Sequence, residues 1–236
     1  MSEIESEMKA LDFLKSTGCR AVIFDMDGVL ADTEEFHLEA WIRLVEAHGL
    51  ETGDQVPSEE MLELIRSTFG QANDTIIPLL WEKAGRPIGD ELAALSLEKE
   101  HCYRGCAGRR VRPMPGIEDF LGLLKKENIP AAIGTSGPEE NVSFLLEEFS
   151  WENVFDSLVH RSRFRKGKPA PDCFLTAAEE LGQAPDKTVV FEDSVHGLMA
   201  ARSGGFTAAA IASTHEPAEL REYTEWVFRD FRSLSC

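Results

Sequence analysis

An apolar run near the start of the chain ends abruptly on acidic residues. It reads Ala21-Val22-Ile23-Phe24-Asp25-Met26-Asp27-Gly28. An unbroken run of branched and aromatic side chains is typical of a strand that is buried on both faces. A carboxylate at the end of such a strand is costly unless something pairs with it. Asp25 and Asp27 therefore point to a cation, a phosphate group, or both as their partner.

The second half of the chain alternates between short apolar runs and amphipathic segments. Strands are predicted at residues 131–134, 157–160, 188–191, 206–211 and 225–228, with helices between them. Alternation of this kind predicts a parallel sheet covered by helices on both faces, an α/β fold.

The block between the first strand and residue 110 has a different rhythm. Its apolar residues recur with a helical period over residues 34–48, 58–68, 73–84 and 90–103, and glycine or proline separates these segments. We expect an all-helical insertion, a cap over residues 33–110, with the α/β core formed by residues 1–32 and 111–236. A further amphipathic helix is predicted over residues 2–16.

Composition narrows the class of protein. The 236 residues carry a formal net charge of −18, which disfavours nucleic acid and anionic membranes as partners. Five scattered cysteines do not form a disulfide framework, and Cys102 and Cys106 lack the further soft ligands of a zinc site. No apolar run approaches transmembrane length, and the N-terminus is too acidic for a signal or transit peptide. We expect a soluble protein of a reducing compartment such as the cytoplasm.

Polar residues follow two further predicted strands. Thr135, Ser136 and Gly137 come directly after the strand at 131–134, and Glu192 and Asp193 come directly after the strand at 188–191. The carboxyl ends of parallel strands meet at one edge of the sheet, where ligands bind. These residues are therefore expected to lie close to Asp25 and Asp27.

The four carboxylates of this edge would repel one another without a counter-charge. A hard divalent cation removes that problem, and oxygen ligands suit Mg²⁺. We predict a magnesium site formed by Asp25, Asp27, Glu192 and Asp193, with Asp25 and Asp193 as its direct ligands. A surface acid pair is the alternative for Glu192 and Asp193 alone, but ligands from several strands favour a metal site.

The remaining polar groups suit an anion. Thr135, Ser136 and Gly137 lie at a strand-to-helix junction, where hydroxyls, backbone amides and the helix dipole favour phosphate. The same residues also suit helix capping, and both roles can hold at once. Lys168, in a loop with glycine and proline on either side, could neutralise a phosphoryl oxygen, although a loop lysine is often simply solvated.

These residues suit phosphoryl transfer. Asp25 is the candidate nucleophile that accepts the phosphoryl group as an aspartyl phosphate, which water then hydrolyses. Asp27 would protonate the leaving alkoxide and then take a proton from the attacking water. Thr135 and Lys168 complete the predicted catalytic set, in which Mg²⁺ and Lys168 offset the charge on the phosphoryl oxygens.

With these motifs in order, the chain resembles the haloacid dehalogenase superfamily of phosphohydrolases. Asp25-Met26-Asp27-Gly28 matches the first motif of that superfamily, Thr135 the second, Lys168 the third and Glu192-Asp193 the fourth. The resemblance implies a Rossmann-like core with a small helical cap. The Asp-x-Asp form of the first motif implies phosphate transfer and not dehalogenation.

Within the superfamily, the chain looks most like the β-phosphoglucomutase and sugar-phosphate phosphatase branch. That resemblance places His37 near Asp27. It also places Glu34 where its carboxylate could bind a substrate hydroxyl. His37 fits equally well as a packing residue of its helix. The mutases carry a cap arginine that grips a second phosphate, whereas the corresponding loop here, residues 69–74, has none. A cap amide such as Asn73 would suit neutral hydroxyls.

The favoured function is thus a magnesium-dependent phosphatase of a small, sugar-like phosphate monoester. Two alternatives remain: a β-phosphoglucomutase-like isomerase, and a receiver domain that uses a similar acidic site for signalling. The long helical insertion argues against a receiver, which has no cap. The sequence does not decide between monomer and homodimer, nor which small phosphorylated metabolite binds.

Overall fold

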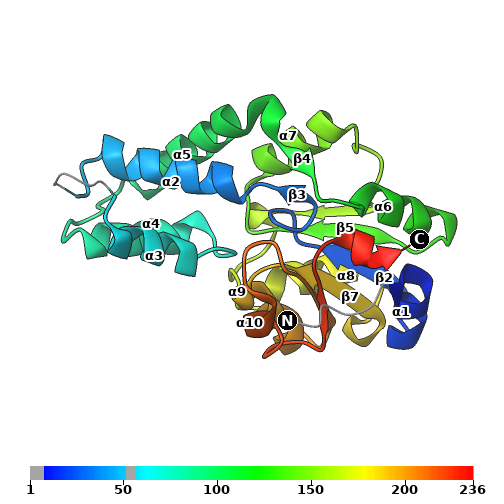
Figure 1. Cartoon of the computed structure of the whole chain (residues 1–236). Coiled ribbons are helices and arrows are strands. Elements are labelled where there is room, and N and C mark those ends of the chain that lie inside the picture. Colours follow the sequence, from blue (N-terminus) through cyan, green and yellow to red (C-terminus); the bar gives the residue numbers. More distant parts are fainter. Residues whose placement is uncertain (1–7, 52–56, 236) are drawn as a thin grey trace. The chain divides into compact units, whose positions relative to one another are not determined.

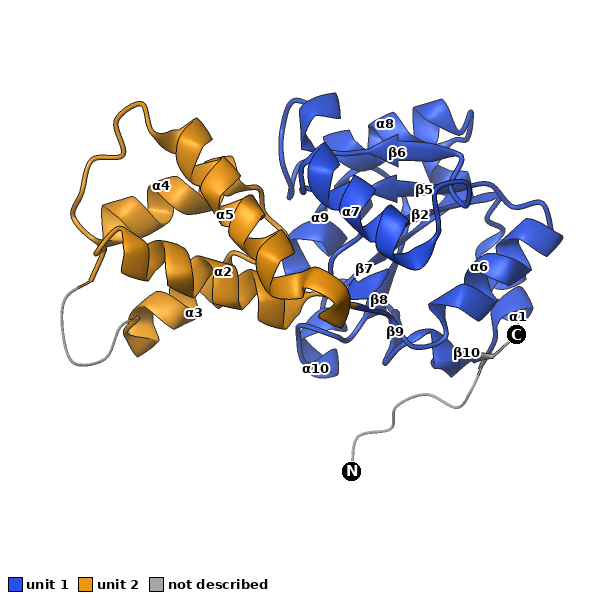
Figure 2. Ribbon diagram, turned by 90° about the horizontal axis from the view of Figure 1, so that it is seen from above, with its two compact units in different colours: residues 1–32, 112–236 blue, residues 33–111 orange. Residues whose placement is uncertain are grey.

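The computed structural model of the chain describes residues 8–51 and 57–235. They fall into two compact units, shown in different colours in Figure 2. The sheet unit combines Met1–Asp32 with Arg112–Cys236, and the helical unit is Thr33–Val111. The fold prediction is confirmed: this is an α/β protein with a parallel sheet and a helical insertion after its first central strand.

Six parallel strands form the centre of the sheet unit (Figure 1). Their order across the sheet is β6-β5-β2-β7-β8-β9. They are β2 (Ala21–Phe24), β5 (Ala131–Gly134), β6 (Ser157–Val159), β7 (Thr188–Glu192), β8 (Thr207–Ile211) and β9 (Trp226–Phe228).

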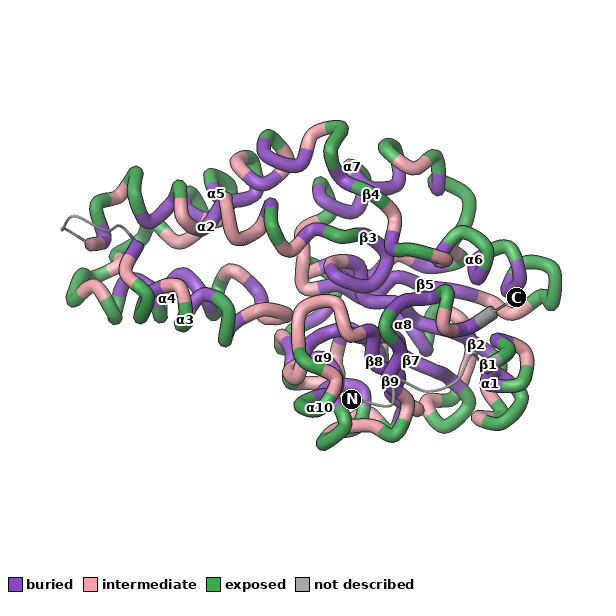
Figure 3. Tube along the Cα trace, in the orientation of Figure 1, coloured by how far each residue is buried: buried purple, intermediate pink, exposed green. Residues whose placement is uncertain are grey.

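Alternate side chains of the central strands fill two apolar layers. Ile23 of β2 and Val190 of β7 belong to a buried cluster that also takes in residues of α8 and α9. Phe24 and Phe191 face the other way, where their stacked rings meet Phe120 of α6. Figure 3 shows the central strands as the most continuously buried part of this unit. Burial on both faces explains why these strands are apolar without alternation.

Helices and turns connect these strands on both faces. The helices of the sheet unit are α1 (Ala10–Thr17), α6 (Ile117–Lys126), α7 (Glu139–Phe149), α8 (Asp172–Glu180), α9 (Val195–Ser203) and α10 (Pro217–Leu220).

The path of the chain reverses its direction across the sheet at β2. After β2 the chain forms β5 and β6 on one side, and then returns to form β7 on the other side of β2. Phe24 pairs with Ile133 of β5 and with Phe191 of β7, so the ends of all three strands are level. Such a reversal of strand order is where open α/β sheets bind ligands.

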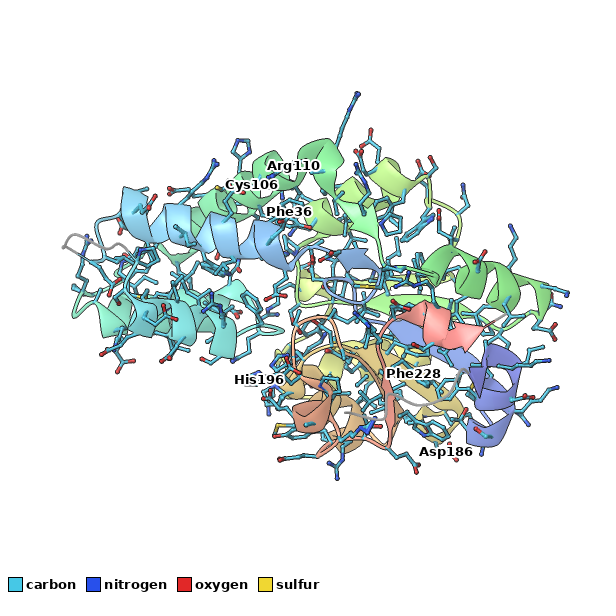
Figure 4. All side chains as sticks on the ribbon, viewed as in Figure 1. Phe36, Cys106, Arg110, Asp186, His196 and Phe228 are labelled. Atoms are coloured by element: carbon cyan, nitrogen blue, oxygen red, sulfur yellow. The ribbon has the colours of Figure 1, made fainter. Side chains whose placement is uncertain are left out.

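In the described part of the helical unit the α-helices are α2 (Glu34–Ala47), α3 (Glu59–Ser67), α4 (Asn73–Lys83) and α5 (Leu92–Ala107). Their shared core includes Trp41, Ile65, Ile77 and Trp81. At the end of α5 the Arg110 guanidinium lies 4.8 Å from the centre of the Phe36 ring and donates from Nε to the Cys106 carbonyl (Figure 4).

Some local predictions were wrong. Of the helix predicted over residues 2–16, residues 2–7 lie outside the described part. Met8–Lys9 is strand β1, paired with β10 (Leu234–Ser235), and the helix begins at Ala10. A second short pair, β3 (Ala31–Asp32) with β4 (Arg112–Pro113), was also missed. Strands of two residues are too short to give a periodic signal.

Among the described residues, no helix combines the length and the apolar character that crossing a bilayer requires.

Phe191 offers a test of the aromatic layer. Its ring is fully buried, with centroids 5.5 Å from Phe24, 5.4 Å from Phe120 and 5.1 Å from Phe231. Phe191→Ala should lower the free energy of unfolding by about 3–5 kcal/mol, because it leaves a cavity that neighbouring rings cannot fill. Denaturant unfolding followed by circular dichroism measures this. The exposed control Met199→Ala should change it by less than about 0.5 kcal/mol, and a similarly small loss in Phe191→Ala would contradict the packing described.

Candidate active site

The loop after β2 holds the first acidic pair. The backbone amide of Asp25 donates to the Phe191 carbonyl at 2.9 Å, which continues the sheet by one residue. The chain then turns tightly, and the Gly28 amide donates to the Ala31 carbonyl at 2.9 Å. Asp25 is 4% exposed, whereas Asp27 is half-buried. The sheet thus fixes Asp25, while Asp27 is the part-exposed residue of an otherwise buried turn.

Only glycine fits at position 28 of this turn. Its φ is +73°, and a Cβ atom there would lie 2.1 Å from Asp193 Oδ2. The missing side chain therefore lets the Asp193 carboxylate approach the turn directly.

Lys168 links two strand ends. Its ammonium nitrogen lies 2.9 Å from Asp25 Oδ1 and 2.5 Å from Glu192 Oε1, and its side chain is fully buried. Burial alone would lower the pKa of Lys168, but the charges of Asp25 and Glu192 outweigh it and raise that pKa above its ordinary value. Lys168 is therefore a buried cation held between two carboxylates.

Glu192 is held from both sides. Its Oε1 accepts from Lys168, while its Oε2 accepts from the backbone amides of Asp193 (2.9 Å) and Ser194 (2.8 Å) and from the Ser194 hydroxyl (2.9 Å). Burial raises the pKa of Glu192, but Lys168 and these hydrogen bonds lower it by more, so it lies below its ordinary value. Glu192 is an ionised carboxylate at the end of β7, just before α9.

The pKa values of Asp193 and Asp25 shift in the opposite direction, upward. Burial, then the charges of Glu192 and Asp25, raise the pKa of Asp193 well above its usual range. Burial also raises the pKa of Asp25 to about 7; Lys168 opposes the rise, and Glu192 and Asp27 add to it. One lysine does not balance three buried carboxylates, so this group attracts a further positive charge.

A divalent cation fits this group. Carboxylate oxygens of Asp25, Glu192 and Asp193 all lie within 4.8 Å of one another, and an all-oxygen set of this kind suits Mg²⁺. The Asp27 carboxylate, also predicted as a ligand, is not part of this cluster of described residues. Both oxygens of Glu192 already accept hydrogen bonds, which leaves Asp25 and Asp193 with more capacity to bind a metal.

The end of β5 carries the predicted anion-binding residues. The Thr135 amide donates to the Val159 carbonyl at 2.9 Å, and the Thr135 hydroxyl accepts from the Gly137 amide at 3.0 Å. Thr135 is 1% exposed, while Ser136 and Gly137 are half-buried. The hydroxyl thus shapes the turn before α7, and its own proton can still be donated. The predicted capping role is wrong, because the N-cap residue of α7 is Pro138 and no side-chain hydrogen bond caps this helix.

Two polar groups predicted on the helical insertion have partners inside the helical unit. The His37 ring stacks on Tyr103 at 3.8 Å, and its Nδ1 lies 2.7 Å from Lys99 Nζ. Lysine can only donate, so Nδ1 accepts, which leaves the histidine proton on Nε2. Asn73 Nδ2 donates to Glu100 Oε1 at 2.7 Å, and Lys99 donates to the same oxygen at 2.9 Å.

The third predicted residue of the insertion, Glu34, is half-buried in the first turn of α2. Neither Lys99 nor Glu100 was predicted to matter, since adjacent charges on a helix normally face solvent. Here both side chains are buried, and the Lys99 ammonium lies 4.7 Å from the centre of a Trp41 ring.

Comparison with known proteins fits this arrangement of strand ends. Residues 19–205 match the family model of the haloacid dehalogenase-like hydrolases, which is most of the chain. The chain belongs to this family. The resemblance found in its motifs is thereby confirmed, and the protein is a phosphatase, a hydrolase of phosphoric monoesters.

Relatives in the family include both phosphatases and a mutase. The chain is 34% identical to the phosphorylated carbohydrates phosphatase of Thermotoga maritima, over 78% of this chain and 81% of the relative. It is 30% identical to the β-phosphoglucomutase of Bacillus subtilis, over 81% of this chain and 83% of that protein. The crystal structure of a hydrolase from Pseudomonas syringae superposes with a TM-score of 0.80 at 27% identity, covering 91% of this chain and 95% of that one.

Gly197 in the first turn of α9 tests how Glu192 is held. A Cβ atom at Gly197 would lie 1.7 Å from Glu192 Oε1. Gly197→Ala should therefore displace Glu192 from Lys168 and lower the free energy of unfolding by about 2–4 kcal/mol. Denaturant unfolding measures the loss.

Gly122 provides the matched control. It lies within α6, and a Cβ atom there meets nothing within 4 Å. Gly122→Ala should gain up to about 1 kcal/mol from helix propensity. Equal stabilities for the two alanine variants would show that Glu192 does not need the space at Gly197.

Proposed function

We propose that this protein is a magnesium-dependent phosphatase of phosphorylated sugars that works through an aspartyl phosphate on Asp25. The observation that carries the proposal is the buried group at the strand ends, in which Lys168 pairs with Asp25 and Glu192 beside Asp193. A fixed carboxylate next to a buried cation is the arrangement that nucleophilic attack on an anionic phosphate requires.

In the first step an oxygen of Asp25 forms a bond to phosphorus while the bond from phosphorus to the sugar oxygen breaks. Asp27 supplies the proton that the leaving alkoxide needs. In the second step Asp27 takes a proton from water, the water oxygen bonds to phosphorus, and the bond to Asp25 breaks, which releases phosphate and regenerates both carboxyl groups. The partial exposure of Asp27 suits a group that must exchange protons twice.

Other residues bind the phosphoryl group. Thr135, Ser136 and Gly137 supply hydroxyls and amides before α7, and Lys168 supplies positive charge. Mg²⁺ bound by Asp25 and Asp193, with Glu192 in support, would neutralise charge on the phosphoryl oxygens. We retain Asp27 as a further candidate ligand of the metal.

The helical unit supports a sugar phosphate over a bisphosphate. We assign Glu34, His37 and Asn73 to the recognition of substrate hydroxyls. The amide of Asn73 donates to the buried carboxylate of Glu100, whose charge Lys99 balances at 2.9 Å, so this part of the unit offers an amide where the mutases carry an arginine. A neutral amide suits substrate hydroxyls, whereas a second phosphoryl group is bound best by the charged fork of an arginine. The Thermotoga relative, named for phosphorylated carbohydrates, supports the same substrate class.

Asp25→Asn tests the nucleophile. It should lower kcat on any substrate by at least about 10⁴-fold, because the amide cannot form the aspartyl phosphate. Phosphate release from a panel of hexose and polyol phosphates with Mg²⁺ measures this, and chelation of Mg²⁺ should abolish activity in the unaltered protein. Asp186→Asn is the matched control, since the Asp186 side chain is 71% exposed on a surface turn (Figure 4). Activity retained in Asp25→Asn would rule out the mechanism.

The mutase alternative has a direct test. When a hexose 1-phosphate is followed by phosphorus NMR, free phosphate should accumulate without a lag. A hexose 6-phosphate as the main product would show an isomerase instead.

A further inference from the structure

A fourth strand end reaches the site, and its residues were not predicted to take part. The chain leaves β8 at Ile211, and Ser213, Thr214 and His215 follow in the loop before α10. β8 lies beside β7 with Glu192 paired to Ala210, so this loop begins at the same edge of the sheet as Asp193.

Ser213 contacts the turn of the nucleophile. Its hydroxyl donates to the Gly28 carbonyl at 2.6 Å. A Cβ atom on Gly28 would lie 3.0 Å from this hydroxyl oxygen and 2.1 Å from Asp193 Oδ2. Gly28 is therefore enclosed between Ser213 and the Asp193 carboxylate.

Thr214 contacts Asp193 itself. The Thr214 hydroxyl oxygen lies 2.7 Å from Asp193 Oδ2, 3.1 Å from the Asp193 carbonyl oxygen and 2.9 Å from His215 Nδ1. A hydroxyl has one proton to donate, and the carboxylate oxygen is both the shortest contact and the strongest acceptor of the three. In the tautomer that protonates Nδ1, His215 donates to the same hydroxyl, which fixes the direction in which Thr214 donates.

We propose that Thr214 is a positioning residue for metal binding: its hydroxyl holds Oδ2 of Asp193 and so leaves Oδ1 for Mg²⁺. The inference rests on the proposed function, in which Asp193 is a metal ligand. Two adjacent residues thus hold two parts of the site. Ser213 holds the turn after Asp25, and Thr214 holds the Asp193 carboxylate after β7. Outer partners of this kind commonly change metal affinity by about 10–100-fold when they are removed.

The test compares hydroxyl and methyl at one position. Thr214→Val keeps the shape of the side chain and removes the donor, whereas Thr214→Ser keeps the donor. Mg²⁺ alone is titrated into each full-length protein without substrate, and its Kd is taken from the rise in Tm with Mg²⁺ concentration. Thr214→Val should raise the Kd for Mg²⁺ by about tenfold or more, and Thr214→Ser should stay within about threefold of the unaltered protein.

Thr176→Val is the matched control. The Thr176 hydroxyl donates to the Asp172 carbonyl within α8 at 2.9 Å, so the same substitution there should leave the Kd for Mg²⁺ unchanged. If Thr214→Val does not fold by circular dichroism, Thr214→Ala replaces it with the same expected result. An Mg²⁺ Kd in Thr214→Val within threefold of the unaltered protein would overturn the inference.

A steady-state measurement adds a second readout. The Mg²⁺ concentration that half-activates Thr214→Val should rise with the Kd, while kcat at saturating Mg²⁺ falls by less. The two proposals fail in different ways. If Thr214→Val hydrolyses substrate and binds Mg²⁺ with normal affinity, the role of Thr214 is refuted and the phosphatase proposal stands. If the unaltered protein binds Mg²⁺ in a way that depends on Thr214 but hydrolyses no monoester, the phosphatase proposal is refuted and the role of Thr214 stands.

Discussion

The ion pairs of Lys168 with Asp25 and Glu192 are the interaction on which the site depends. All three groups are buried, and burying charges is expensive unless they are paired with good geometry. Lys168 comes from a loop and its two partners come from neighbouring strands, so the pairs form only when the parallel sheet is complete. The same attraction fixes the nucleophile. Removing one member would leave the others as uncompensated buried charge, which links correct folding of the sheet to assembly of the site.

The sequence predicted the sheet well because each central strand is a short apolar run that stops on polar residues. Asp25 and Glu192 were placed at strand ends by that pattern alone, and the structure brings both into contact with Lys168. The family resemblance followed from the order of the same motifs and is confirmed by the family match. Strong local patterns are reliable where burial on both faces demands them.

What the sequence did not predict depends on contacts between distant residues. Thr214 lies in an ordinary polar loop after a strand, and nothing local shows that its hydroxyl reaches Asp193, 21 residues earlier. Lys99 and Glu100 look like a solvated pair, yet helix packing buries them with His37 and Asn73. Gly197 reads as an ordinary residue near a helix start until Glu192 is seen in the space that a side chain would fill. Each of these roles is set by tertiary structure and leaves no periodic trace.

The short pair of β3 with β4 has a consequence for how this protein can diversify. The chain enters the helical insertion just after Asp32 and returns just before Arg112, and these residues pair with each other in an antiparallel ladder. Entry and exit are therefore adjacent, and the insertion needs only to begin and end side by side. We therefore expect that helical segments of other lengths and sequences, grafted at this junction, would leave the register of the six-stranded sheet unchanged. The junction is thus a natural boundary for building chimaeras within the family.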